Sequence, residues 1–318
     1  MDKQENKPRR RPWLLLELML ILVLTGLAML LMPALSGVAN EKTRTVPAGF
    51  DIVQDVEYAR VGGHPLVLDI YDPRPPDSEP RPVAVFIHGG AWRGGDKRGG
   101  AIYLRQLVEA GYLCFSVNYR LSGQAKYPAQ IHDCKAAVRW IRKHCEQYGG
   151  DPGRIAALGP SAGGHLVALL AMSNGDPTLE GTVGDCLDES SAVQVVADWF
   201  GPSDLVKMGD AEIHDWHRDI LEDLFGQPLE EIPGVLAEAS PALHVDAADV
   251  PVIIIHGTAD DTVPVEQSRH FNAVLAAAGV DVEYVEVEGG KHGHFRGCDP
   301  DHWELIDLMI AFFDEHLE

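Results

Sequence analysis

The sequence predicts an α/β fold with a mostly parallel central sheet and helices on both of its faces. From residue 50 onward, short apolar runs typical of buried strands alternate with longer segments of helical periodicity. The chain of 318 residues is long enough for one large domain of this kind. No internal repeat or second apolar core interrupts the alternation, so we expect one domain.

The expected strands are short and rich in Val, Ile, Leu and Phe. Continuous apolar runs of this length are typical of strands that are covered on both faces, as in a parallel sheet. The segments are residues 66–71, 83–87, 112–117, 155–158, 193–200, 252–255 and 282–287.

The expected helices occupy segments between and after these strands. Ile131, Val138 and Ile141 recur at helical spacing, and Gly149 should end their helix. A helix should also begin at Pro264 and stop at Gly279. The segments are residues 131–148, 162–172, 264–279 and 303–317.

Residues 174–247 fit this rhythm poorly. The segment is acidic, contains Trp199 and Trp216, and precedes the last strands as an insertion would. Long insertions at the carboxyl edge of a sheet commonly shape a binding site. We therefore expect a cap-like insertion.

The charge of the chain is strongly negative. Lys and Arg number 26 and Asp and Glu 48, which gives a formal net charge of −22. Such a chain repels phosphate backbones and anionic lipid surfaces, so nucleic-acid binding is not expected. The charge also disfavours strongly anionic substrates.

The N-terminal segment has the features of an export signal. A basic cluster at residues 8–12 precedes an apolar run over residues 13–32, and about 20 apolar residues can cross a bilayer. The basic flank should stay in the cytoplasm. Small residues up to Ala39 suit a signal peptidase. We expect residues 1–39 to be a signal peptide or an uncleaved anchor. A domain over residues 40–318 would then be secreted, periplasmic or membrane-anchored.

The five cysteines do not have the spacing of a zinc site, and no metal is expected. Cys114 falls in an apolar strand, where a thiol acts as a small apolar group. Cys186 and Cys298 fall in loop-like segments, so export makes a disulfide between them possible.

The first chemical motif is Gly159-Pro160-Ser161-Ala162-Gly163, between a predicted strand and a predicted helix. Glycines around a serine permit a sharp turn that exposes the hydroxyl above the sheet edge. The following helix directs its N-terminal N–H groups toward developing negative charge. Ser161 is therefore the candidate nucleophile.

The second motif is His88-Gly89-Gly90-Ala91-Trp92, directly after the strand at residues 83–87. Paired glycines let the backbone approach a substrate and present N–H groups, as an oxyanion hole requires. The candidate donors are the N–H groups of Gly89, Gly90 and Ala162. Trp92 is a candidate substrate-binding residue.

The third motif supplies a base and its orienting carboxylate. Asp260 follows one strand and His292 follows the next, so both should reach the edge where Ser161 stands. The order Ser, Asp, His matches that of α/β-hydrolases. Asp261 and His294 are competing assignments. We interpret His256 as a packing residue and His165 as a support for the elbow helix.

From about residue 50 the chain resembles the α/β-hydrolase superfamily. Within it, the chain is similar to the exported bacterial esterases and lipases grouped with the feruloyl/acetyl-xylan esterase and hormone-sensitive-lipase-like families. The matching stretches are residues 85–92, 118–121, 150–155, 159–166, 201–204 and 256–264.

The resemblance implies an α/β-hydrolase fold with Ser161 as nucleophile, Asp260 as acid and His292 as base, and it implies no cofactor. One departure concerns the oxyanion loop, where Ala91 replaces the third glycine of lipase-type members. The second donor therefore stays open between Gly89 and Gly90.

The predicted function is that of a serine carboxylic ester hydrolase that works through an acyl-enzyme. We expect short-chain, aryl or acetyl esters as substrates, including carbohydrate-linked ones. One alternative is an amidase or peptidase of this fold, resembling kynurenine formamidases or acylaminoacyl peptidases. The other is a non-catalytic exported binding module, although such modules usually lose triad members.

Overall fold

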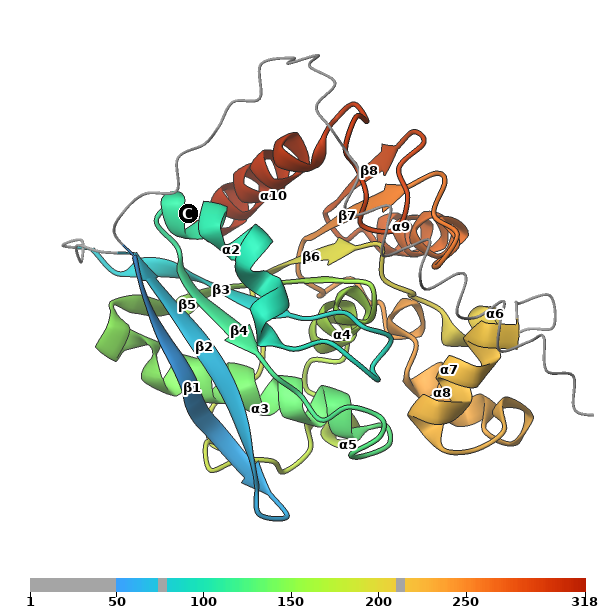
Figure 1. Ribbon diagram of the computed structural model, residues 1–318, viewed down its shortest axis with the longest axis horizontal. Coiled ribbons are helices and arrows are strands. Elements are labelled where there is room, and N and C mark those ends of the chain that lie inside the picture. The colour runs from blue at the N-terminus through green and yellow to red at the C-terminus, as the bar shows by residue number, and fades with distance from the viewer. Residues whose placement is uncertain (1–49, 74–78, 210–214) are drawn as a thin grey trace, which may run out of the picture. The chain divides into compact units, whose positions relative to one another are not determined.

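The central sheet of the described residues has eight strands, in the order β1-β2-β4-β3-β5-β6-β7-β8 (Figure 1). The structure is a computed structural model that describes residues 50–73, 79–209 and 215–318. The neighbouring strands from β4 to β8 in this order are parallel, whereas β2 is antiparallel to both β1 and β4. The predicted mostly parallel sheet is confirmed. The strands are β1 (Phe50–Val61), β2 (His64–Pro73), β3 (Arg81–Ile87), β4 (Leu113–Val117), β5 (Gly150–Pro160), β6 (Val195–Trp199), β7 (Val252–Gly257) and β8 (Val282–Val287).

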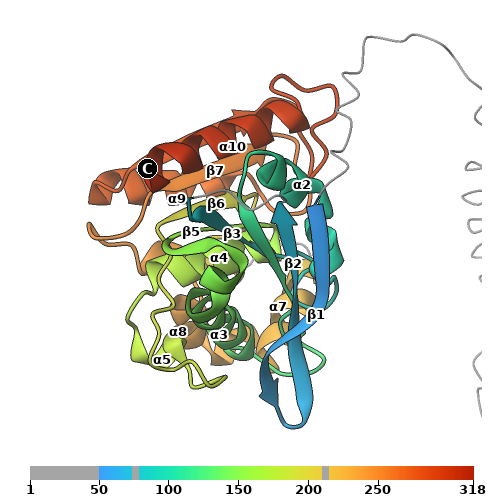
Figure 2. The same ribbon diagram turned by 90° about the vertical axis from the view of Figure 1, so that its left-hand side faces the viewer.

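Helices cover both faces of this sheet, as predicted (Figure 2). One face packs against α2 (Ala101–Glu109) and α10 (His302–Leu317) through a cluster that includes Trp199 and Phe313. The other face packs against α3 (Ala129–His144), α4 (Ala162–Met172) and α9 (Glu266–Ala278). Short 3₁₀ helices occur at Lys97–Gly100, Cys145–Tyr148, Leu229–Glu231 and Pro241–Leu243.

The edge strand β1 was not among the predicted strands. Most of its side chains are exposed or half-buried, so it lacks the apolar run that marks a central strand. It is joined to β2 by Gly62-Gly63, both with positive φ. A Gly-Gly pair of this kind is typical of a tight hairpin turn. The sequence therefore indicates the turn more clearly than it indicates strand β1.

The segment predicted as an insertion contributes both to the sheet and to a group of helices. Strand β6 lies within residues 174–247 and pairs with β5 and β7. The additional helices are α5 (Pro177–Glu180) before β6, then α6 (Leu205–Gly209), α7 (Asp215–Phe225) and α8 (Pro233–Glu238) after it. Helices α6, α7 and α8 lie together beyond the carboxyl edge of the sheet (Figure 1).

The suggested disulfide between Cys186 and Cys298 is wrong, because all five cysteines are free. Cys298 packs against the cluster on the α2 and α10 face. Cys186 lies near Lys143 of α3, on the opposite face of the sheet, so the two thiols are separated by the sheet itself. Cys114 is buried in β4, as predicted.

The predicted signal segment, residues 1–39, lies outside the described residues. In the part of the chain that the structure describes, no helix has the length and hydropathy needed to cross a bilayer.

Candidate active site

Ser161 stands at a sharp turn between β5 and α4. Its φ of 57° and ψ of −122° are unusual for a residue with a side chain, and such strain is concentrated at functional sites. Its N–H donates to the carbonyl of Trp199 at 2.8 Å. A Cβ on Gly163 would lie 2.0 Å from the Ile87 carbonyl oxygen, so only glycine permits this close crossing of β3 and the turn.

The loop over residues 88–92 lies directly against this turn. A Cβ on Gly89 would lie 2.6 Å from the carbonyl oxygen of Pro160 and 3.4 Å from Cβ of Ser161. Ala91 and Trp92 have positive φ values of 53° and 56°. Ala91 stands where lipase-type members have a third glycine. Its backbone is in the left-handed region, although it carries a side chain.

His88 holds the start of this loop in place through ring stacking and hydrogen bonds. Its ring stacks on Tyr119 with the centroids 4.3 Å apart, and the Tyr119 hydroxyl donates to the His88 carbonyl at 3.0 Å. Burial lowers the pKa of His88, which favours the neutral ring. Its Nδ1 lies 2.8 Å from the Gly89 carbonyl oxygen and, as an N–H, donates to it.

The candidate N–H donors come from two elements. Ala162 is the first residue of α4, so its N–H has no acceptor within the helix. The N–H groups of Gly89 and Gly90 have no acceptor among the described residues. All three are therefore available to a bound oxyanion.

Asp260 and His292 are in direct contact. Nδ1 of His292 lies 2.7 Å from Oδ2 of Asp260, and the Asp260 side chain is fully buried. Oδ1 of Asp260 accepts the N–H groups of Thr262 and Val263 at 2.8 and 2.9 Å. The carboxylate is thereby fixed in orientation before it meets the imidazole.

The electrostatics of Asp260 keep it ionised. Burial acts to raise its pKa, but hydrogen bonds from His256 and His292 outweigh burial and hold the pKa well below the usual range. A carboxylate that stays charged next to an imidazole can stabilise the imidazolium that forms during proton transfer.

The competing residues lie elsewhere. Asp261 is exposed, and its carboxylate lies 3.5 Å from the Thr262 hydroxyl, with no contact to a histidine among the described residues. His294 is exposed, and its backbone pairs with that of Lys291. The structure therefore brings together Asp260 and His292, and not their neighbours.

Phe200 connects these residues to Ser161, and no sequence motif pointed to this role. Its ring meets that of His292 edge to face, with centroids 4.7 Å apart. The preceding residue, Trp199, accepts the N–H of Ser161. Phe200 has a φ of 47°, so the turn after β6 is strained like the turn at Ser161.

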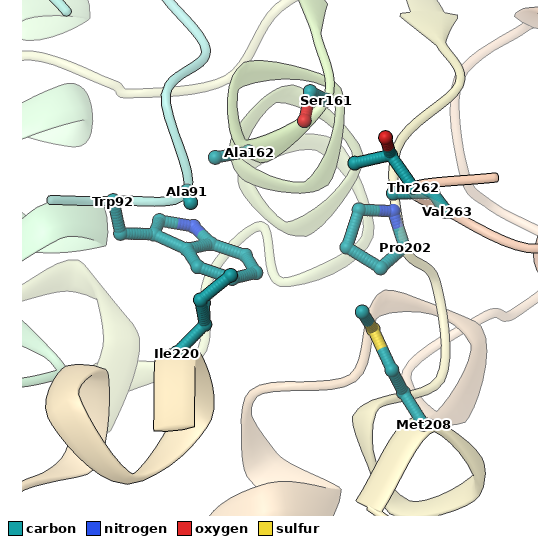
Figure 3. A pocket seen from close by; sticks show the side chains of 9 residues that line it. All are labelled: Ala91, Trp92, Ser161, Ala162, Pro202, Met208, Ile220, Thr262 and Val263. Carbon is teal, nitrogen blue, oxygen red and sulfur yellow. The ribbon is translucent and has the colours of Figure 1, made fainter. Parts of the chain in front are cut away.

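A pocket opens beside Ser161 (Figure 3). In the close view, the Ser161 hydroxyl lies on one side of the pocket, and Trp92, Ile220 and Met208 form the far walls. Met208 belongs to α6 and Ile220 to α7, so the helices after β6 complete the pocket. The lining consists of Ala91, Trp92, Ser161, Ala162, Pro202, Met208, Ile220, Thr262 and Val263.

Among the described residues, no three His, Cys, Asp or Glu side chains are grouped as metal ligands would be.

The comparisons with known proteins agree with this geometry. Residues 68–275 match the BD-FAE family. Esterase LipQ of Mycobacterium tuberculosis is 37% identical over 75% of this chain and 56% of its own length. A truncated carbohydrate esterase from gut microbiota superposes with a TM-score of 0.75 at 32% identity, over 84% of this chain and 96% of that one.

A thermophilic esterase, Est2 of Thermogutta terrifontis, superposes in its propionate-bound form with a TM-score of 0.70 at 31% identity. That match covers 84% of this chain and 94% of the other. The same esterase has also been solved after phosphorylation by paraoxon. The chain spans little more than half the length of three mycobacterial relatives, Esterase LipQ, Esterase LipC and the probable carboxylic ester hydrolase LipM, between 55% and 56%.

Proposed function

Since the chain belongs to the BD-FAE family of α/β-hydrolase esterases, we propose that it hydrolyses carboxylic esters with Ser161, His292 and Asp260 as its catalytic triad. The observation that supports this most strongly is the 2.7 Å contact between His292 and the fully buried side chain of Asp260, with Ser161 half-buried at a strained turn.

In the proposed first step, His292 removes the proton of the Ser161 hydroxyl as the oxygen attacks the ester carbonyl. Nδ1 of His292 is occupied by Asp260, so Nε2 is the nitrogen left to take the proton. The protonated ring then gives this proton to the leaving alcohol. Water repeats the sequence on the acyl-enzyme and releases the acid and free Ser161.

The negative charge of each tetrahedral intermediate falls on the former carbonyl oxygen. The N–H of Ala162 and those of Gly89 and Gly90 are the proposed donors to it. Gly89 lies close to Cβ of Ser161 because it has no side chain. Preformed donors of this kind cost no reorganisation during the reaction.

We propose that the pocket binds the acyl group and accepts short chains. Trp92, Met208 and Ile220 close it at a short distance from Ser161 (Figure 3), and its lining is apolar apart from two hydroxyl groups. A related thermophilic esterase has been solved with propionate and with butyrate bound. The alcohol part of the ester would extend outward, where carbohydrate can be accommodated.

The test combines covalent labelling with a substrate panel. Incubation with paraoxon followed by peptide mass spectrometry should place a diethyl phosphate on Ser161, with parallel loss of activity. p-Nitrophenyl acetate and butyrate should be hydrolysed faster than the octanoate. Acetylated and feruloylated polysaccharides, tested beside them, identify the alcohol part.

The control is Ser161→Ala. This variant should not be labelled by paraoxon, and it should not hydrolyse any of the esters. Activity retained in Ser161→Ala would contradict the proposal. Faster turnover of p-nitroanilides than of esters would instead identify an amidase of the same fold.

A further inference from the structure

A second histidine lies against the carboxylate of the proposed triad. We propose that His256 is a positioning residue that donates a hydrogen bond to Asp260 and tunes the basicity of His292. The inference rests on the proposed function, because it concerns the same carboxylate and the same base.

The contacts of His256 fix its tautomer. The side chain is fully buried at the end of β7, and Nε2 lies 2.9 Å from the Val263 carbonyl oxygen and 3.2 Å from Oδ2 of Asp260. Nδ1 lies 2.7 Å from the Ser268 hydroxyl. A carbonyl oxygen can only accept, so Nε2 carries the proton and Nδ1 accepts from Ser268.

Oδ2 of Asp260 therefore faces two imidazole N–H groups. One is Nδ1 of His292 at 2.7 Å, and the other is Nε2 of His256 at 3.2 Å. Each donor stabilises the ionised carboxylate, in agreement with the lowered pKa of Asp260. With the His256 donor removed, Asp260 becomes more basic and attracts the proton of His292 more strongly.

His256 has a second effect, which is geometric. Its Nε2 contacts both Asp260 and Val263, two residues of the same loop, so the ring holds that loop against β7. Ser268, on α9, holds the ring from the other side. The donation from Ser268 polarises the ring and strengthens the Nε2–H donor, since hydrogen bonds in a chain reinforce one another.

Other charged groups face His256 from the neighbouring strands. Asp198 on β6 and Glu286 on β8 both interact with it electrostatically. Glu286 is paired with Arg269, whereas Asp198 is buried. Because His256 acts on the titration of Asp198 as well, the pH test below is repeated in an Asp198→Asn background.

The experiment measures the pH dependence of kcat/KM for p-nitrophenyl acetate in the full chain. His256→Phe keeps the ring volume and removes both nitrogens, whereas His256→Gln keeps a terminal N–H that can reach Asp260. His316→Phe is the matched control, because His316 also pairs with an aspartate, Asp281, but lies on α10. Thermal unfolding of each variant is measured in parallel.

We expect His256→Phe to lower kcat about ten- to a hundredfold, as loss of a hydrogen bond to a charged group does. The acid limb of its profile should move to higher pH, with and without Asp198→Asn. His256→Gln should restore most of the activity and the wild-type limb. Ser268→Ala should shift the limb in the same direction by less, and His316→Phe should leave it unchanged.

An unchanged acid limb in folded His256→Phe would overturn the inference, even if the variant were less stable. If His256→Phe does not fold, Ser268→Ala decides: a shift supports the inference and no shift overturns it. The proposed function fails separately, namely if His292→Ala keeps its esterase activity.

Discussion

The indole N–H of Trp92 donates to Nδ1 of His165 at 3.3 Å, and the two rings meet edge to face with centroids 5.1 Å apart. Nε2 of His165 lies 2.7 Å from the carbonyl oxygen of Ala239, the residue that directly follows α8. Burial lowers the pKa of His165 to about 4, so the neutral ring can accept from Trp92 and donate to Ala239. His165 thus joins the loop over residues 88–92, helix α4 and the helices after β6.

Because this contact fixes a wall of the pocket, we predict that Trp92→Phe changes acyl-chain preference. The variant lacks the indole N–H and leaves a wider pocket. The ratio of kcat/KM for p-nitrophenyl hexanoate to that for the acetate should rise about tenfold. This is the lower end of the discrimination that a hydrophobic pocket achieves between substrates that differ by one methylene group. Trp303→Phe, at an exposed tryptophan of α10, should leave the ratio unchanged. An unaltered ratio in Trp92→Phe would show that Trp92 does not limit the acyl chain.

The pairing of Asp260 with His292 predicts a clear ranking of four variants. Asp260→Asn should lower kcat by about 10⁴-fold because the imidazole is held in the wrong tautomer. His292→Ala should lower it by about 10⁶-fold because the base is lost. Asp261→Asn and His294→Ala, at exposed neighbours, should retain most activity. Steady-state kinetics decide, and the opposite order in either pair would transfer the role to the neighbour.

The close approach of Gly89 to the Ser161 turn predicts that Gly89→Ala inactivates the enzyme. The new Cβ would lie 2.6 Å from the Pro160 carbonyl oxygen, so the loop must move away from the turn. Displacing an oxyanion donor should lower kcat by about 10²- to 10³-fold. Gly99→Ala is the control, because a Cβ there meets no atom within 4 Å. A kcat for Gly89→Ala equal to that of Gly99→Ala would remove Gly89 from the oxyanion hole.

The sequence allowed the fold to be predicted where a signal is local. The apolar runs of β3 and β7 and the glycines around Ser161 each specify their own conformation, so these elements were found. Helix α2 also has buried residues at helical spacing, Tyr103, Leu104 and Leu107 among them, although it is not among the predicted helices. The side chains of β1 are mostly exposed, so its sequence has no apolar run that would indicate a strand.

The site could be predicted only as far as its motifs extend. The motifs indicated Ser161, Asp260 and His292 as candidates. The contact of His256 with Asp260 was not predicted, because it depends on how the loop after β7 folds back toward the strand. The contact of Trp92 with His165 depends on the crossing of two segments 73 residues apart. Such partners are set by tertiary packing, and spacing in the sequence does not encode them.

The buried carboxylate of Asp198 predicts an unusual dependence of stability on pH. Burial raises its pKa to about 6 from its ordinary value of 3.8, although the N–H of Gly201 and nearby His256 act to lower it. Between these two values the folded chain holds the proton more tightly than the unfolded chain does. The contribution of Asp198 to stability therefore falls as the pH rises through this window, by about 3 kcal/mol in total.

Asp198→Asn removes this titration. The difference in its free energy of unfolding from that of wild type should be about 2.5 kcal/mol higher, that is, more stabilising, at pH 8 than at pH 4. Any fixed cost of burying the amide cancels in that comparison. Chemical denaturation at the two pH values measures it, and a pH-independent difference between the two proteins would show that Asp198 is already ionised in the fold at pH 4.

The last prediction concerns residues 1–39, whose basic cluster and apolar run lead us to propose export of the domain that follows. The proposed site residues all lie between 88 and 294, so a chain that begins at Asn40 should be soluble and active. In cells that make the full chain, activity should be found outside the cytoplasm. N-terminal sequencing then separates a cleaved signal, with a new start near Asn40, from an anchor, with Met1 retained in the membrane fraction. Activity confined to the cytosol, with the N-terminus intact, would refute export, because an apolar run behind three arginines would then have failed to direct the chain to the membrane.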